Sequence, residues 1–298
     1  MPTWFTKYKV GSRLMSLVLL MVLLFVWHAA TAAPVFDPTG LSEDDIMLME
    51  MNGDIIPDPE NEGKYITNPE KSTAFPGPLK VGKKIVEEFS EPFHKKGTND
   101  HGIGWLIIYT LIVFSIGFLV ASLVGIVLGV MIGLSQTLFD VLNPFLQVLK
   151  PISPLAWMPL LLYTVQDGKI TSVLVVFMAS LWPTVANTAF GVNNIRQDYL
   201  RVASLLQFNW FRRLFTVILP GAAPAIISGL RISFGSALVA VVPAEMLLGE
   251  LGVGYNTWIE WNNLDISGVI FTILVIGVLG FILDALFDRV AKGVSFAE

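Results

Sequence analysis

Ionisable side chains inside apolar segments are the features of this sequence that point most directly to chemistry. Four stand out: Lys150, Arg231, Glu245 and Asp284. A charged group at membrane depth is costly, so it usually lines a path or pairs with an opposite charge. Lys150 and Arg231 each lie about ten residues from one end of an apolar segment, or roughly 15 Å at the helical rise. Two cations at one depth predict an anion path. The alternative is that each pairs with a carboxylate or extends toward an interface.

A proline-rich stretch, KPISPLAWMP, begins at Lys150. Pro151, Pro154 and Pro159 oppose an unbroken helix, and interrupted helices are tolerated at membrane depth where they line a cavity. The freed carbonyls would then face a polar solute, unless the prolines only produce a packing kink. We predict a substrate path from this stretch, the mid-depth charges and similar chemistry in the next apolar segment: Lys150, Ser153, Trp157, Trp182, Asn187, Arg231 and Glu245.

The motifs of common enzymes are absent. There is no G-x-x-x-x-G-K-[ST] phosphate loop, no H-E-x-x-H and no G-x-S-x-G. The chain has no cysteine, and its three histidines show no metal-ligand spacing. Gly249, Gly252 and Gly254 follow no strand and are interpreted as turn formers. We therefore expect no catalytic residue, metal or cofactor in this chain, but a membrane conduit driven from elsewhere.

The composition requires membrane helices around these residues. The 298 residues are 54% hydrophobic and 14% charged, with a mean hydropathy of +0.66, whereas soluble domains carry about 25% charged residues. Apolar runs of about 20 residues predict transmembrane helices. The predicted fold is an all-α integral membrane protein with six spans, at about 14–33, 104–132, 141–163, 170–192, 221–247 and 266–288.

Basic residues in the short loops predict the orientation. Lys7, Lys9 and Arg13 precede the first span with no acid among them, which places the N-terminus in the cytoplasm. Six crossings return the C-terminus to the same side, together with the arginine-rich segment 193–220. We divide the chain into a tail with span one (1–33), an external insert (34–103), a five-span core (104–292) and a C-terminal tail (293–298).

The first span has an alternative interpretation. Its basic start, apolar core and Ala30-Thr31-Ala32 before Ala33 are also typical of a cleaved secretory signal. The apolar run is long for a signal core, so we favour a retained span.

The insert at 34–103 is acidic, with 14 Asp and Glu against 7 Lys and Arg. Its first half is rich in proline and glycine, so little regular structure is expected beyond a short helix around 42–51. The later sequence PLKVGKKIVEEF predicts an amphipathic helix lying on the membrane surface. The acidic half is either a solvated spacer, which we favour, or a docking surface for an external partner.

Small residues recur at helical spacing in the second span, with G-x-x-x-G at 125–129 and at 129–133. Such faces allow helices to approach closely. The pattern fits either a bundle within the chain or a dimer interface.

The segment RVASLLQFNWFRRLFTVILP, residues 201–220, predicts a basic amphipathic helix between two spans. Its apolar residues have no membrane depth to occupy on the cytoplasmic side. They need a partner surface or the bilayer interface.

This segment, with ISGLRISFGSALVAVVPAEML, LGVGYNTW and LKPISPLAWMPL, resembles the permease subunits of binding-protein-dependent ABC importers, in the nitrate, sulfonate, taurine and bicarbonate branch. The resemblance covers about residues 76–292. The family's cytoplasmic loop carries Glu-Ala-Ala, three residues, Gly and a closing Leu-Pro. Here Ala203 and Leu219-Pro220 fit, whereas Arg201 replaces the Glu and Gln207 the Gly.

The resemblance implies that the loop is a coupling helix seated in a groove of a cytoplasmic ATPase, which holds ATP and Mg²⁺. The coupling residues implied are Arg201, Ala203, Gln207, Phe208, Asn209, Trp210, Arg212 and Arg213. It also implies an external solute-binding protein, a second permease subunit, here expected as a homodimer, and a multi-pass place in the bacterial inner membrane. Membrane lipid surrounds such a chain, and no nucleic-acid partner is expected.

The predicted function is import of a small anion, nitrate or nitrite or bicarbonate, by alternating access. Organic sulfonates such as taurine are the alternative within the family. An ion-gradient-driven transporter or a structural membrane adaptor are the alternatives of other classes.

Overall fold

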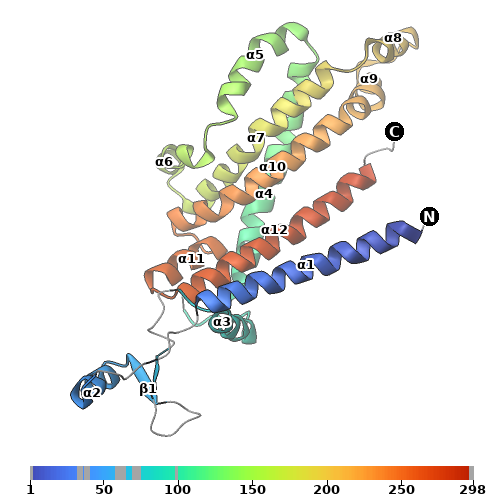
Figure 1. Cartoon of the computed structure of the whole chain (residues 1–298). Helices are drawn as coiled ribbons and strands as arrows, with labels where there is room; N and C mark the ends of the chain where they lie inside the picture. The colour runs from blue at the N-terminus through green and yellow to red at the C-terminus, as the bar shows by residue number, and fades with distance from the viewer. Residues whose placement is uncertain are drawn as a thin grey trace. The chain divides into compact units, whose positions relative to one another are not determined.

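A computed structural model describes residues 3–31, 36, 41–57, 65–68, 75–97 and 100–294. Two compact units are present, Met1–Ser90 with Leu264–Phe271, and Glu91–Asn263 with Thr272–Glu298. Helices make up most of the described chain, as predicted (Figure 1). The alanines of the alternative cleavage site, Ala32 and Ala33, lie outside the described residues, as does the end of the C-terminal tail, 295–298.

The first unit contains α1 (Thr3–Ala30), α2 (Glu43–Met51), the two-stranded hairpin β1 (Ile55–Pro57) and β2 (Tyr65–Thr67), and α3 (Pro78–Ser90). The short helix expected around 42–51 and the amphipathic helix expected after residue 78 are both confirmed. The hairpin, which pairs Ile56 with Ile66, contradicts the expectation of little regular structure beyond α2. Sequence patterning missed it because each strand is only three residues long.

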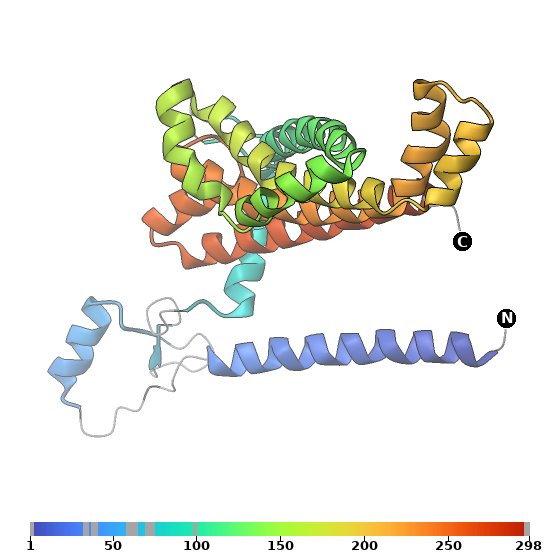
Figure 2. The same cartoon turned by 90° about the horizontal axis from the view of Figure 1, so that it is seen from above.

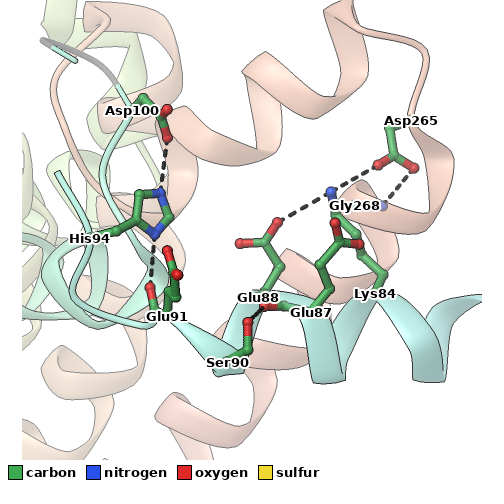
Figure 3. A network of polar contacts seen from close by, with 9 residues as sticks. All are labelled: Lys84, Glu87, Glu88, Ser90, Glu91, His94, Asp100, Asp265 and Gly268. Atoms are coloured by element: carbon green, nitrogen blue, oxygen red, sulfur yellow. Dashed lines mark hydrogen bonds and ion pairs between the residues drawn. The ribbon is translucent and has the colours of Figure 1, made fainter. Parts of the chain in front are cut away.

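Within the first unit, an ion pair joins α3 to Asp265, the residue that precedes α12 (Ile266–Val294). Lys84 Nζ lies 3.1 Å from Asp265 and 3.2 Å from Glu88 (Figure 3). Asp265 also accepts a hydrogen bond of 3.1 Å from the Gly268 N–H, which begins α12 with a charged cap. Phe89 of α3 packs edge-on against Phe271 of α12, with ring centroids 5.8 Å apart.

The second unit is built on three long helices, α4 (Ile103–Gly133), α7 (Gly168–Asn193) and α10 (Leu219–Leu248), which lie side by side (Figure 1). They confirm the helices predicted at 104–132, 170–192 and 221–247. An aromatic cluster joins α4, α10 and the later part of α12, where Phe114, Phe118, Phe234 and Phe287 pack at centroid distances of 5.0–6.4 Å.

The small-residue stripe of α4 packs against α7 within this chain. A Cβ at Gly125 would lie 2.8 Å from Thr184, and one at Gly133 would lie 2.6 Å from the Ala189 carbonyl. The stripe therefore serves the intrachain bundle, which was one of the two alternatives that the sequence left open.

The interruption that the prolines predict within the segment 141–163 is confirmed. The structure has two helices, α5 (Gln136–Leu149) and α6 (Pro154–Val165), bent by 91° at the proline segment. Pro151 and Pro154 lack the N–H groups that would continue the helix, and Pro154 begins α6 instead. The described residues hold four helices able to cross a membrane, or five if the bent pair is one span. The apolar part of α1, Leu14–Ala30, is shorter, so the six-span count stays a prediction.

The predicted single amphipathic helix at 201–220 is wrong. Helix α8 (Gln197–Leu205) ends before a turn, after which α9 (Trp210–Arg213) leads through the π-helix η1 (Leu214–Ile218) into α10. Gln207 lies in the turn with φ +50°. In Figure 2, α8 and α9 project from one end of the three-helix core.

The predicted loop after α10 contains a further helix, α11 (Val253–Asn262). Of the three glycines interpreted as turn formers, Gly249 has the positive φ of a helix C-cap, +68°, whereas Gly252 and Gly254 do not. Those two allow close packing against Glu245 and Val242.

Candidate functional site

A cavity of about 470 Å³ opens where the α5–α6 bend meets α7 and α10. This volume is typical of small-molecule sites. Four of the predicted path residues line it: Lys150 and Ser153 from the bend, Trp182 from α7 and Arg231 from α10. The remaining lining is mostly apolar, and Ser236 adds one hydroxyl. The structure thus brings together residues separated by 81 positions in the sequence, from 150 to 231.

The bend places the polar groups of its own segment at the cavity wall. Lys150 is the C-cap of α5, and its backbone N–H still donates to the Leu146 carbonyl at 3.0 Å. Ser153 is the N-cap of α6, but its side chain makes no capping hydrogen bond. Its hydroxyl is therefore not committed to α6. The Trp182 indole N–H is buried and has no partner among the described residues.

Arg231 of α10 forms ion pairs with two carboxylates of α12. Its guanidinium lies 3.0 Å from Asp288 and 3.9 Å from Asp284, and its side chain is 55% exposed. The alternative that a mid-depth cation pairs with a carboxylate is therefore confirmed for Arg231. Lys150 is exposed and has no ion-pair partner within the part of the chain that the structure describes. The cavity thus carries one paired and one unpaired cation.

Trp157 and Asn187 are not among the residues that line this cavity. Asn187 donates from Nδ2 to the Pro183 carbonyl at 2.8 Å, and its Cβ fills the space beside Gly229 of α10. Trp157 is half-buried on α6. Asn187 has a packing role visible in the structure, and a path role for either residue stays a prediction.

Glu245 also lies away from the cavity, fully buried between α4, α10 and α11. Its Oε2 accepts hydrogen bonds of 3.0 Å from Thr110 Oγ1 and from the Gly254 N–H. Thr110 Oγ1 in turn accepts from the Val253 N–H at 3.0 Å. Oε1 has no partner among the described residues, and Gly252 approaches the carboxyl closely. This arrangement fixes the start of α11 to α4 and α10.

The predicted coupling segment forms a compact turn with apolar side chains outside. Asn209 Oδ1 accepts from the Arg212 N–H at 2.8 Å and caps α9. The Arg212 guanidinium lies 4.4 Å from the centre of the Phe208 ring, which holds this ring in the turn. Ala203 is buried, whereas Leu205, Trp210 and Phe211 are 83%, 56% and 66% exposed.

Two hollows flank this turn. One is lined by Arg201 and Arg213 with Leu200 and Leu205, and the other by Tyr199, Val202 and Phe208. The segment therefore presents a surface of mixed basic and apolar character. All eight predicted coupling residues lie between the start of α8 and the end of α9.

The sequence matches the model of the binding-protein-dependent transport system inner membrane component over residues 121–296. The chain belongs to this family. The permease is 37% identical over 210 residues to the nitrate import permease protein NrtB of Synechocystis sp., covering 70% of this chain and 76% of that protein. It is 36% identical to the bicarbonate transport system permease protein CmpB of Synechococcus elongatus, covering 72% and 78%. The taurine transport system permease protein TauC of Escherichia coli is 31% identical over 151 residues, 51% of this chain and 55% of that protein.

A solved structure supports the fold. The permease superposes with a TM-score of 0.53 on a chain of the inward-facing methionine ABC transporter MetNI, at 12% identity, covering 64% of this chain and 97% of that one. The chain is thus an ABC importer permease of the nitrate, bicarbonate and taurine branch, a multi-pass component of the bacterial inner membrane. This membership favours the ATP-driven class over the two alternatives of other classes.

Sequence reasoning missed two residues of these sites. Asp288 makes the shorter ion pair to Arg231, but it lies near the end of a span where a carboxylate is unremarkable in sequence. Thr110 bridges Glu245 and α11, but a lone threonine in an apolar run gives no signal. The i, i+4 spacing of Asp284 and Asp288 could have revealed the first pair.

Proposed function

We propose that this permease moves a small inorganic anion, nitrate or nitrite or bicarbonate, from an external binding protein to the cytoplasm. The observation that carries the proposal is the shared cavity wall of Lys150 and Arg231. An ammonium and a guanidinium facing one partly apolar space suit a small anion, because both groups donate charged hydrogen bonds. The similarity to nitrate and bicarbonate permeases, at 37% and 36% identity, supports the same class of solute.

The unpaired Lys150 is the first contact that we propose for the anion. Arg231 would follow by exchange, since an anion entering the cavity competes with Asp284 and Asp288 for the guanidinium. A pair that is half exposed is weak enough for such exchange, at about 0.2–1 kcal/mol. The solute would thereby loosen α12 from α10, which gives it a differential effect on two conformations, as alternating access requires.

A second permease subunit would complete the path. Val239 and Ile232 line the cavity and are 76% and 48% exposed, so this wall has an apolar margin that lipid or protein must cover. We propose a homodimer in which two such cavities face each other. A heterodimer with a related permease would cover the same margin.

The α8–α9 turn is proposed to couple this movement to a cytoplasmic ATPase, which would hold ATP and Mg²⁺. Leu205, Trp210 and Phe211 would enter an apolar groove, and the arginines beside them would contact an acidic rim.

Organic sulfonates are the second candidate solute, favoured by the 31% identity to TauC. A sulfonate is also an anion, so Lys150 and Arg231 would serve it equally. The apolar lining from Met178 and Leu155 would contact its carbon chain.

Reconstituted transport would test the proposal. The permease, its ATPase and its binding protein are placed in liposomes, and uptake of labelled nitrate, bicarbonate and taurine is compared. Lys150→Ala and Arg231→Ala should each lower anion uptake at least about tenfold, as expected for loss of a charged hydrogen bond. Lys169→Ala is the matched control, since Lys169 lies at the start of α7 and does not line the cavity. Unchanged uptake in both cavity variants, or uptake without the ATPase, would overturn it.

A further inference from the structure

The part of the insert formed by α2 and its hairpin, residues 41–57 and 65–68, is closely tied together. We call it the α2 module. Ser42 and Asp45 form a reciprocal capping box at the start of α2. Asn68 Nδ2 donates to the Gly53 carbonyl at 2.7 Å, and the Tyr65 hydroxyl donates to Glu50 at 3.0 Å. Ile55 is buried under these contacts, at 1% exposure. The module is therefore not a shapeless spacer.

Helix α2 is apolar on two sides, but the residues that the structure describes cover one side only. Ile46 and Met49 are half-buried. Met47, Leu48 and Met51 follow the opposite i, i+1, i+4 stripe and are 64%, 57% and 79% exposed. A solvated spacer has no need of this second stripe, which is the pattern of a helix that offers an apolar face to a groove. Methionine is also a side chain that adapts well to a partner surface.

The negative charge of the α2 module limits which kind of partner can cover the exposed stripe. The α2 module carries Glu43, Asp44, Asp45, Glu50 and Asp54, and residues 41–57 and 65–68 contain no lysine or arginine. Two copies of the module would repel each other, as would the module and an anionic membrane surface. The complementary partner is a protein face with an apolar groove and a basic rim.

We propose that the α2 module docks the external solute-binding protein of this importer. The proposal rests on the proposed function, since it needs an importer with the insert on the external side. The module lies outside the matched family segment 121–296, so it adds to the shared permease scaffold. It would let this permease select its own binding protein, with the acidic residues speeding encounter and the apolar stripe slowing release.

Binding of the purified binding protein to the assembled transporter in lipid nanodiscs tests this directly. Joint substitution Met47→Ser, Leu48→Ser and Met51→Ser should weaken binding about tenfold or more, as for loss of an interface centre. The matched control, Met47→Leu, Leu48→Met and Met51→Leu, keeps the stripe apolar and should bind like the native chain. Glu43→Gln with Asp44→Asn should mainly slow association and reduce its dependence on salt.

Uptake measured on the same preparations separates the two proposals. If the serine variant imports normally once binding protein is in large excess, the path is intact and docking alone is impaired, as expected. Unchanged affinity in the serine variant would overturn the docking role, and so would a change in oligomeric state without a change in affinity. Failure of the native transporter to import any anion would instead count against the proposed function.

Discussion

The Arg231 guanidinium lies 3.0 Å from the Asp288 carboxylate while it also forms part of a cavity wall. Arg231 comes from the middle of α10 and Asp288 from the later part of α12. One side chain therefore belongs to both the proposed solute site and a contact between two helices of the core. This shared use gives the proposed anion a means of changing how α10 and α12 are held.

Asp288→Asn should raise the affinity for the transported anion. The substitution removes the stronger competitor for Arg231, and a pair of this exposure is worth at most about 1 kcal/mol, or roughly two- to fivefold in KM. The turnover rate should fall, because the return of Arg231 to α12 would no longer help to release the anion. Steady-state uptake over a range of solute-loaded binding protein measures both constants.

Asp140→Asn is the control for this prediction. Asp140 is a carboxylate of α5 that accepts a hydrogen bond of 3.1 Å from Gln136 and does not line the cavity. It should leave KM and turnover unchanged. A KM that rises in Asp288→Asn would mean that Asp288 positions Arg231 for the anion instead of competing with it.

Gln207→Gly should stabilise the turn between α8 and α9. Gln207 has φ +50°, a left-handed conformation that costs a side-chain-bearing residue roughly 1–2 kcal/mol, against about 0.5–1 kcal/mol of added chain entropy for glycine. The net gain is about 0.5–1 kcal/mol, or a two- to fivefold rise in amide protection for α8 and α9 by hydrogen exchange. Val202→Gly, at an exposed position in the interior of α8, should have the opposite effect.

The turn between α8 and α9 could be predicted only in part from the sequence. The resemblance assigns the position of Gln207 to a glycine, and the left-handed backbone supplies the physical reason for that glycine. The sequence alone predicts one continuous helix there, because leucine and phenylalanine spacing continues through the turn. The break depends on the left-handed backbone conformation of Gln207, and a glutamine in the sequence does not predict that conformation.

The residues of the cavity could likewise be predicted only in part from the sequence. The depth of Lys150 and Arg231 along their segments was enough to predict a shared site, and the prolines were enough to predict an interruption. The bend of 91° and the exclusion of Asn187 depend on how α6, α7 and α10 pack, which no single segment encodes. Glu245 was placed in the path because buried charge suggests function, whereas its partners Thr110 and Gly254 tie it to α11.

Thr110→Val should destabilise the contact between α4 and α11. Valine keeps the shape of threonine but removes one of the two hydrogen bonds to Glu245 Oε2 and leaves the Val253 N–H without its partner, at a cost of about 1–3 kcal/mol. Thr110→Ser retains the hydroxyl and should restore most of the loss. Thermal unfolding in detergent measures the difference. Equal melting temperatures for valine and serine variants would contradict a role for the hydroxyl.

The loop before α4 should loosen as the pH rises. The Glu91 carbonyl at 2.8 Å and the Asp100 carboxylate at 3.0 Å flank the His94 ring and raise its pKa above 6.5 (Figure 3). Because the folded pKa is raised, this stabilisation is complete below pH 6.5 and is lost as the pH rises through the folded pKa. The nearby Lys96 opposes the shift.

Protection factors for residues 92–102 at about pH 5.5 and about pH 8.5 would check this, since they remove the intrinsic pH dependence of exchange. His94→Gln should abolish the difference between the two values. An equal difference in that variant would assign the pH response to another group.

Trp210→Ala should uncouple ATP hydrolysis from uptake. Trp210 is 56% exposed and packs edge-on against Phe211 at 5.0 Å, so its loss removes proposed contact surface and little internal packing. Uptake per ATP hydrolysed should fall about tenfold while the ATPase subunits still copurify, because other apolar side chains of the turn remain.

Phe208→Ala provides the contrast, since the Phe208 ring is held under Arg212 and its loss should loosen the turn itself. Hydrogen exchange of α9 distinguishes the two, with protection kept in Trp210→Ala and lowered in Phe208→Ala. Normal coupling in Trp210→Ala would return the α8–α9 turn to the alternative of a helix lying at the bilayer interface.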